Sequence, residues 1–297
     1  EGHLHLRPFV YGTKRVRDPV TLREWHITET DRIYPIYFLG RGDPYKFWGL
    51  FETDIHLFGI EQNYKEAAAL LLGGDELGRD QFSRLLYGAR ISGSVGLAGV
   101  VISLVIGVLL GGISGYYGGT LDMIIQRFIE FLRSIPTIPL WMALSAAIPP
   151  YWSPIRTYFA VTIIISLIGW TGMARVVRGR FLTLREEDFV VAARLAGSGE
   201  MRIIMRHMAP SVLSYIIASV TLSIPEMILS ETSLSFLGLG LRPPAISLGI
   251  LLQSSMSVQA VAIAPWKLMP AIVVVIVVLS FNFLGDGLRD AADPYSR

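Results

Sequence analysis

Five long runs of the sequence contain no Asp, Glu, Lys or Arg, and they limit what this chain can fold into more than any other feature. The runs are residues 91–121, 134–155, 157–174, 207–225 and 268–285. Most are long enough for the roughly 20-residue helix that crosses a hydrocarbon core of about 30 Å. The chain is 17% charged, whereas about 25% of the residues of a soluble domain are charged. The sequence therefore predicts an all-α polytopic membrane protein with five spans.

Residues 1–74 differ in composition from the rest, because they hold four of the five histidines and no long apolar run. Residues 21–28 and 32–39 have the aromatic and β-branched content of short strands, and residues 29–31 are a predicted turn between them. We expect a small extracytoplasmic α+β segment here and a membrane domain over residues 75–297. The spacing of His3, His5, His26 and His56 fits no strong metal signature, so no metal site is expected.

Several classes of function are disfavoured by composition. The net charge of +2 is small and no basic run is interleaved with aromatic residues, so we expect no nucleic-acid partner. The sequence has no cysteine, which excludes disulfides and thiol chemistry. It also has no phosphate-binding P-loop, no Gly-x-Ser-x-Gly and no His-Glu-x-x-His. We expect no enzyme activity and no cofactor on this chain.

The orientation follows from the loop charges. Seven arginines lie between Arg175 and Arg206, and the positive-inside rule places this stretch in the cytoplasm. Counting spans outward puts residues 1–90 outside and the C-terminus inside.

The stretch 188–197 is a charged island between apolar runs, and its spacing suits a cytoplasmic helix that contacts another protein. Phe189, Ala192, Ala193 and Ala196 fall at i, i+3, i+4 and i+7, on one helix face. Gly197 is the predicted left-handed residue that ends the helix. A second helix is expected to carry Met201, Ile204, Met205 and Met208 on one face and Arg202 and Arg206 on another, and to run through Pro210 into a span.

These residues resemble the EAA loop of ATP-binding-cassette (ABC) importer permeases, in which two alanines, a glycine and a later proline recur. Val191 stands where that loop usually has Glu, and Ala209 where it has Leu. The resemblance implies a type I ABC importer transmembrane domain, with residues 188–197 as a helix that couples to the ATPase. The implied coupling residues are Asp188, Phe189, Ala192, Ala193, Arg194, Ala196, Gly197, His207 and Pro210.

Three further motifs resemble the oligopeptide and dipeptide branch of these permeases. They are Gly78-Arg79-Asp80, residues 235–244 and residues 281–294. The resemblance implies two ATPase subunits that bind ATP and Mg, a second permease in a heterodimer, and an extracytoplasmic binding protein. It also implies a bacterial or archaeal inner membrane, and a sixth span that would precede Glu1.

Charged residues next to the apolar runs leave alternatives open. Glu226 and Glu231 are candidates for lining a substrate path, because intramembrane carboxylates are usually functional, but they could equally lie in water at the outer end of a span. Arg127, Glu130 and Arg133 are interpreted as structural ion pairs rather than a substrate site. Pro136 and Pro139 are expected to kink their helix.

Gly107, Gly111, Gly115 and Gly119 recur every four residues and permit close helix approach, within one subunit or between two. An ion- or proton-coupled secondary transporter, with Glu226 and Glu231 as couplers, is the alternative function. We see no internal repeat of the kind such carriers carry. The cargo is left open among peptides, oligosaccharides and metal chelates.

Overall fold

The computed structural model describes residues 7–17, 19, 24–47, 49–60, 67 and 69–292. The chain divides into two compact units, Glu1–Gly74 and Asp75–Arg297. His3 and His5 lie outside the described residues. Among those described, no group of three or more His, Asp or Glu gathers as a metal site would.

The first unit contains the expected strands, and no helix occurs among its described residues. Three antiparallel pairs form: β1 with β2, β3 with β6, and β4 with β5. The strands are β1 (Phe9–Arg17), β2 (Glu24–Pro35), β3 (Tyr37–Phe38), β4 (Arg41–Phe47), β5 (Phe51–Ile55) and β6 (Phe58–Gly59).

The predicted turn at residues 29–31 is wrong, because β2 runs through it. Tyr11 pairs with Ile33 while Gly12 pairs with Glu29, so the extra residues of β2 form a bulge. A bulge accommodates extra residues on one strand while the chain keeps its direction. The polar residues therefore mark an irregularity inside one strand.

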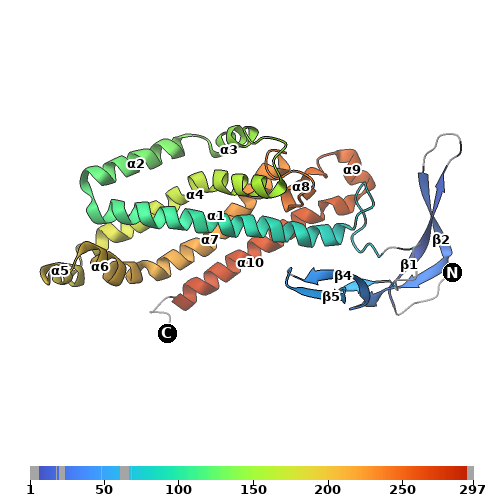
Figure 1. Cartoon of the computed structure of the whole chain (residues 1–297), viewed down its shortest axis with the longest axis horizontal. Coiled ribbons are helices and arrows are strands. Elements are labelled where there is room, and N and C mark those ends of the chain that lie inside the picture. The colour runs from blue at the N-terminus through green and yellow to red at the C-terminus, as the bar shows by residue number, and fades with distance from the viewer. Residues whose placement is uncertain are drawn as a thin grey trace. The chain divides into compact units, whose positions relative to one another are not determined.

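Two long helices form the centre of the second unit. Helix α1 (Gln81–Tyr117) and helix α4 (Pro154–Leu184) lie side by side (Figure 1). Asp80 caps α1 by accepting hydrogen bonds from the N–H groups of Phe82 and Ser83, and the Ser153 hydroxyl accepts one from the N–H of Arg156 at the start of α4. These caps satisfy backbone donors that a helix start leaves unpaired.

The glycine repeat of α1 faces α4 within the same chain. A Cβ added at Gly111 would lie 2.4 Å from the carbonyl oxygen of Ala174, and one at Gly115 would lie 2.7 Å from that of Arg178. Backbones approach this closely only where a side chain is missing. The structure thus favours helix contact inside one subunit over a subunit interface for this repeat.

The predicted span at 134–155 is wrong in its bounds. Two shorter helices occupy this region, α2 (Gly119–Ser134) and α3 (Thr137–Ala146). They are separated at Pro136, whose missing N–H ends the hydrogen-bond ladder. Pro139 causes no break, because it lies in the first turn of α3, where its N–H would have no partner in any case. Gly118 and Gly119 both have positive φ, 63° and 59°, and turn the chain between α1 and α2.

The rest of the unit returns through the bundle twice. The elements are α5 (Asp188–Leu195), α6 (Glu200–Arg202), a π-helix η1 (Ile203–Met208), α7 (Ala209–Phe236), α8 (Leu248–Gln253), α9 (Val258–Ile263), a 3₁₀ turn η2 (Pro265–Leu268) and α10 (Met269–Ala292). Helices α5 and α6 lie at one end of the bundle, and α8 and α9 lie at the other (Figure 1). We call these the α5 end and the α8 end.

Fewer helices than the five expected pass as membrane spans by length and composition. Among the described residues three do so, at 81–117, 154–184 and 265–288. A fourth is counted if residues 200–236, bent by 59°, cross as one broken span. Helices α2 and α3 fall short individually, because the chain is divided at Pro136.

Candidate functional site

Helix α5 is held at its end of the bundle by one buried side chain. Val190 is 0% exposed and belongs to a cluster formed with α1, α4 and the η1–α7 segment. The other members are Tyr116, Met173, Val177, Phe181, Ile203, Met208 and Val212. Burial of an apolar side chain of this size contributes about 1.5–3 kcal/mol. Val190 therefore anchors a short helix that has little stability of its own.

The C-terminus of α5 is closed by a Schellman motif, as the sequence predicts for Gly197. The N–H of Ser198 donates to the carbonyl of Ala193 at 3.1 Å, and the N–H of Gly197 donates to that of Arg194 at 3.0 Å. Gly197 has a φ of 77°, the left-handed region that glycine adopts without steric cost. The motif ends α5 sharply and redirects the chain into α6.

The segment after α5 differs from the expected α-helix. Residues 203–208 form a π-helix, in which the N–H of Ala209 donates to the carbonyl of Ile204, five residues back. Pro210 gives the physical reason: it has no N–H, and its ring would clash with the carbonyl four residues earlier.

The π-helix changes which methionines share a face. Ile203 and Met208, five residues apart, are buried together, whereas Met201 is 71% exposed and Met205 is 63% exposed. The predicted common face of Met201, Ile204, Met205 and Met208 is therefore wrong. Arg202 and Arg206 are both exposed.

Polar contacts fasten the same end of the bundle. The hydroxyl of Tyr117, the last residue of α1, donates to the Glu200 carboxylate at 2.8 Å. Arg178 of α4 donates through Nε and Nη2 to the two carboxylate oxygens of Asp122 in α2, each at 2.5 Å. Such a two-pronged guanidinium–carboxylate pair fixes orientation as well as distance. The base on which α5 rests is thus tied across α1, α2 and α4.

Large apolar side chains are exposed on α5 and on the α6–η1 segment that follows, where the exposed charged residues Glu200, Arg202 and Arg206 lie between them. Leu195 is 85% exposed, Phe189 42% and Val191 40%. We call Phe189, Val191, Leu195, Met201 and Met205 the α5 surface. Large exposed apolar patches rimmed by polar residues mark contact sites for other proteins. Polar residues at the rim are Asp188 and Arg194, both exposed.

The structure separates the sequence-predicted residues into two groups. Asp188, Phe189, Ala192, Arg194, Ala196, Gly197 and Pro210 are exposed, whereas Ala193 and His207 are half-buried. Ala193 packs against the cluster around Val190. Sequence reasoning missed Leu195, the most exposed member of the α5 surface, and the anchor Val190. No signal in the sequence distinguishes these two, because both are apolar residues on the same short helix.

The two carboxylates of α7 lie in different surroundings. Glu226 is exposed on the helix. Glu231 is 0% exposed, and its carboxylate accepts hydrogen bonds from Ser92 of α1 at 2.5 Å and from Ser235 at 2.7 Å. Those hydroxyls in turn accept the N–H groups of Leu248 and Leu241. Glu231 thereby fastens the loop between α7 and α8 to α1, and only Glu226 lies on an open face.

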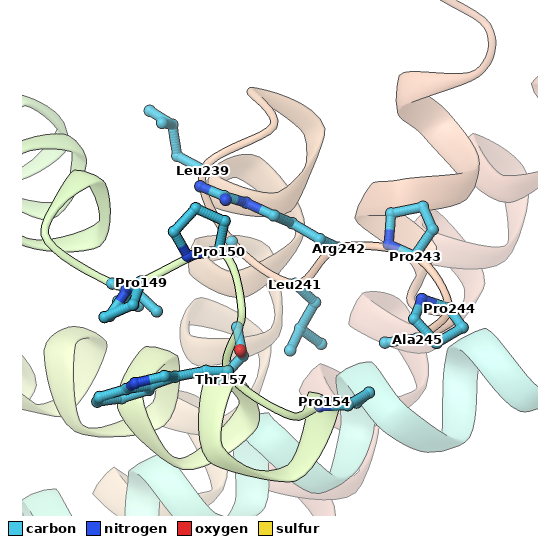
Figure 2. A pocket seen from close by; sticks show the side chains of 13 residues that line it. Pro149, Pro150, Pro154, Thr157, Leu239, Leu241, Arg242, Pro243, Pro244 and Ala245 are labelled. Atoms are coloured by element: carbon cyan, nitrogen blue, oxygen red, sulfur yellow. The ribbon is translucent and has the colours of Figure 1, made fainter.

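A pocket of about 140 Å³ lies at the α8 end, between the loop after α3 and the loop after α7 (Figure 2). Its wall is made mostly of proline and aliphatic side chains, including Pro149, Pro150, Pro243 and Pro244. Arg242 is the one charged residue in its lining. Proline fixes φ near −65°, so the pocket is bounded by stiff loops. Thr157 contributes the one hydroxyl of the lining, which contains no carboxylate, histidine or cysteine.

The described residues of the second unit form a bundle of long apolar helices with the short, largely exposed helix α5 at one end. Comparisons with known proteins identify the class to which such a chain belongs. The chain belongs to the family described as "Binding-protein-dependent transport system inner membrane component", whose model matches residues 107–297. It is a multi-pass inner-membrane permease subunit of an ABC importer and not an enzyme. Its family implies ATPase and substrate-binding partners.

Curated relatives cover most of the chain. It is 39% identical over 238 residues to the dipeptide transport system permease protein DppC of Bacillus subtilis, covering 80% of this chain and 72% of the relative. It is 42% identical over 226 residues to the oligopeptide transport system permease protein OppC of Haemophilus influenzae, covering 76% and 70%. The secondary-transporter alternative finds no support among these relatives.

Solved structures share the fold at low sequence identity. An inward-facing structure of the MetNI methionine ABC transporter matches with a TM-score of 0.57 at 18% identity, covering 71% of this chain and 97% of that chain. An amino acid ABC transporter matches with a TM-score of 0.51 at 14% identity, covering 70% and 94%.

Proposed function

We propose that the α5 surface docks on an ATPase subunit and transmits its movement to the spans. The observation that carries this proposal is the contrast within one helix of eight residues: Val190 is fully buried, whereas Leu195 is 85% exposed. A helix fixed to the bundle on one side and apolar on the other is built to be covered by a second protein.

The connections of α5 support transmission as well as docking. Its anchor belongs to a cluster with side chains of α1, α4 and α7, and Glu200, at the start of α6, accepts a hydrogen bond from Tyr117 at the end of α1. A displacement of α5 would therefore reach several spans at once. Asp188 in the first turn and Arg194 in the last turn also complement the helix dipole, which stabilises α5 as a unit.

The α5 end is proposed to lie in the cytoplasm, with residues 1–74 and the α8 end outside. The arginines between 175 and 206 support this orientation through the positive-inside rule. The proposed assembly contains two ATPases that bind ATP and Mg, a second permease in a heterodimer and an extracytoplasmic binding protein. The absence of a P-loop from the sequence supports ATP hydrolysis on the partner chains.

A peptide is the proposed cargo, because the relatives with about 40% identity are named for dipeptide and oligopeptide transport. In this assignment the exposed Glu226 lines the substrate path, and the buried Glu231 holds the α7–α8 loop. Both carboxylates are thereby given roles that need no proton coupling.

The proposal is tested by uptake into vesicles that contain the permeases and ATPases, with the binding protein outside and ATP inside. Dipeptide accumulation should require ATP and should be unaffected by a proton uncoupler, and Glu231→Gln should keep both properties. Accumulation driven by a proton gradient without ATP, and abolished by Glu231→Gln, would refute the proposal.

A further inference from the structure

Helix α2 has three distinct sides, and this sets it apart from the spans around it. One side is buried: Ile129 is 0% exposed and Leu132 9%, in a cluster with Trp170 and Ala174 of α4. A second side is apolar but exposed, and consists of Leu121, Ile124, Phe128 and Phe131, at i, i+3, i+7 and i+10. A third side carries the charged residues, Arg127, Glu130 and Arg133, at i, i+3 and i+6, together with Ser134 and the exposed Met123. Residues at these spacings share a helix face.

The charged side lies level with the middle of the two long apolar helices, α1 and α4, where we expect the membrane core. Ile129, next to Glu130, packs with Trp170 near the middle of α4, and Ile106, midway along the charge-free run 91–121, packs against the same cluster. In Figure 1, α2 runs along the bundle and not across its end. Charges at this depth do not face lipid without a large cost and are found instead toward protein or water.

The charged side chains on this side of α2 are exposed to solvent. Arg127 donates to Glu130 at 2.8 Å, yet their side chains are 77% and 53% exposed. Arg133, also exposed, has no ion-pair partner among the residues that the structure describes. Charges that are buried between proteins need partners for every ion, whereas charges in a water-filled path do not. The exposed apolar side suits lipid, so the two exposed sides face different surroundings.

We propose that Arg127, Glu130 and Arg133 of α2 line the aqueous translocation path and contact the charged ends of the cargo as it passes. The inference rests on the proposed function and assigns part of the path to residues that sequence reasoning interpreted as structural ion pairs. Guanidinium groups pair with a carboxylate, and Glu130 pairs with an ammonium group. Cations and an anion on one side of a helix therefore suit a zwitterionic solute such as a short peptide.

The first test measures water access by cysteine labelling. The chain has no native cysteine that would react with the reagent. Single Arg127→Cys and Glu130→Cys variants of the assembled transporter in vesicles are compared with Ile124→Cys and Phe131→Cys, which are 61% and 62% exposed in the wild-type chain on the apolar side. A charged, membrane-impermeant thiol reagent is supplied on both faces. We expect the first pair to react at least about tenfold faster, because thiolates form in water and not in lipid. Equal, slow reaction of all four variants would overturn the proposal.

Cargo contact is the second test. Arg127→Gln and Arg133→Gln should lower the rate of ATP-driven uptake of a dipeptide with an extra carboxylate about tenfold relative to one with an extra amine, and Glu130→Gln should shift the preference the other way. Ile124→Gln is the control for a polar change on the apolar side. Unchanged preference in all three charge variants would overturn the inference. Wild-type uptake that needs no ATP would instead refute the proposed function, so the two failures are distinguishable.

Discussion

Replacement of Leu195 by alanine should weaken ATPase binding without destabilising the permease. The side chain is 85% exposed, so the bundle loses almost nothing when it is shortened. A docked ATPase can bury most of that surface. Leu→Ala removes three carbon groups at about 0.8 kcal/mol each, and with about 85% of the area available the loss is about 2 kcal/mol. This corresponds to about a 30-fold rise in Kd.

The assay is titration of the purified ATPase against the detergent-solubilised permease pair, with thermal unfolding measured in parallel. Val190→Ala is the matched control on the same helix, because that side chain is fully buried. It should lower the unfolding temperature, since a cavity in the cluster adds to the lost transfer free energy. If Leu195→Ala leaves the Kd unchanged, or lowers stability as much as Val190→Ala does, the assignment of inner and outer sides of α5 is wrong.

Three other predictions follow from the backbone and from the segment that leads into α1. Gly111→Ala should destabilise the bundle by about 1–3 kcal/mol, because its Cβ would lie 2.4 Å from the carbonyl oxygen of Ala174. Gly93→Ala meets no atom within 4 Å and should stabilise α1 by about 0.5–1 kcal/mol, because alanine favours a helix interior over glycine; unfolding in detergent compares the two variants, and equal effects would contradict the close approach at Gly111. Gly197→Ala should weaken ATPase binding, because an alanine at φ 77° costs about 1–2 kcal/mol of backbone strain. Gly199→Ala should leave binding unchanged, because φ there is −65°. Equal effects of the two substitutions on the Kd would contradict the role of the turn. Burial alone would raise the pKa of Asp75, but hydrogen bonds from Arg79 and Leu77 and the charge of Arg84 lower it overall. Asp75→Asn should therefore cost stability at neutral pH, and its difference from the wild type should vanish as the pH falls through the lowered pKa; a difference that persists in acid would contradict this.

The sequence predicts the class of fold well, because the apolar runs and the EAA-like spacing depend on local chemistry. The sequence-based prediction of spans fails where a helix carries charged residues within it. A search for charge-free runs places a span at 134–155, yet the structure divides this region at Pro136, and the helix before the break begins at Gly119 and carries Asp122, Arg127 and Glu130. Such a search overlooks a helix that carries charged residues within it, as α2 does.

The sequence predicts the helix of the proposed site, but not which side of that helix is anchored. The spacing of Phe189, Ala192, Ala193 and Ala196 identifies a helix face, and the sequence alone would choose Ala193 as the position to perturb. The structure places Ala193 against the cluster around Val190, so a bulky substitution there would disturb the subunit itself. Leu195 is the better probe. Which side of a short helix is anchored depends on the chains it packs against, and local sequence does not contain that information.

The carboxylates of α7 show the same limit. Glu226 and Glu231 are both flanked by apolar residues, and sequence reasoning treats them alike. Their difference comes from residues far away in the chain: Ser92 lies 139 positions before Glu231 and donates to it directly. Only tertiary structure reveals that one carboxylate fastens a loop while the other remains exposed.

Photo-crosslinking from α5 in the assembled transporter tests the central claim most directly. A photoreactive amino acid is placed at Leu195 and, as a control, at Tyr151 near the α8 end; both wild-type side chains are 85% exposed. The account predicts a crosslink to the ATPase from position 195 and none from position 151. A crosslink to the ATPase from position 151, or none from position 195 in a complex that hydrolyses ATP, would contradict the docking of α5.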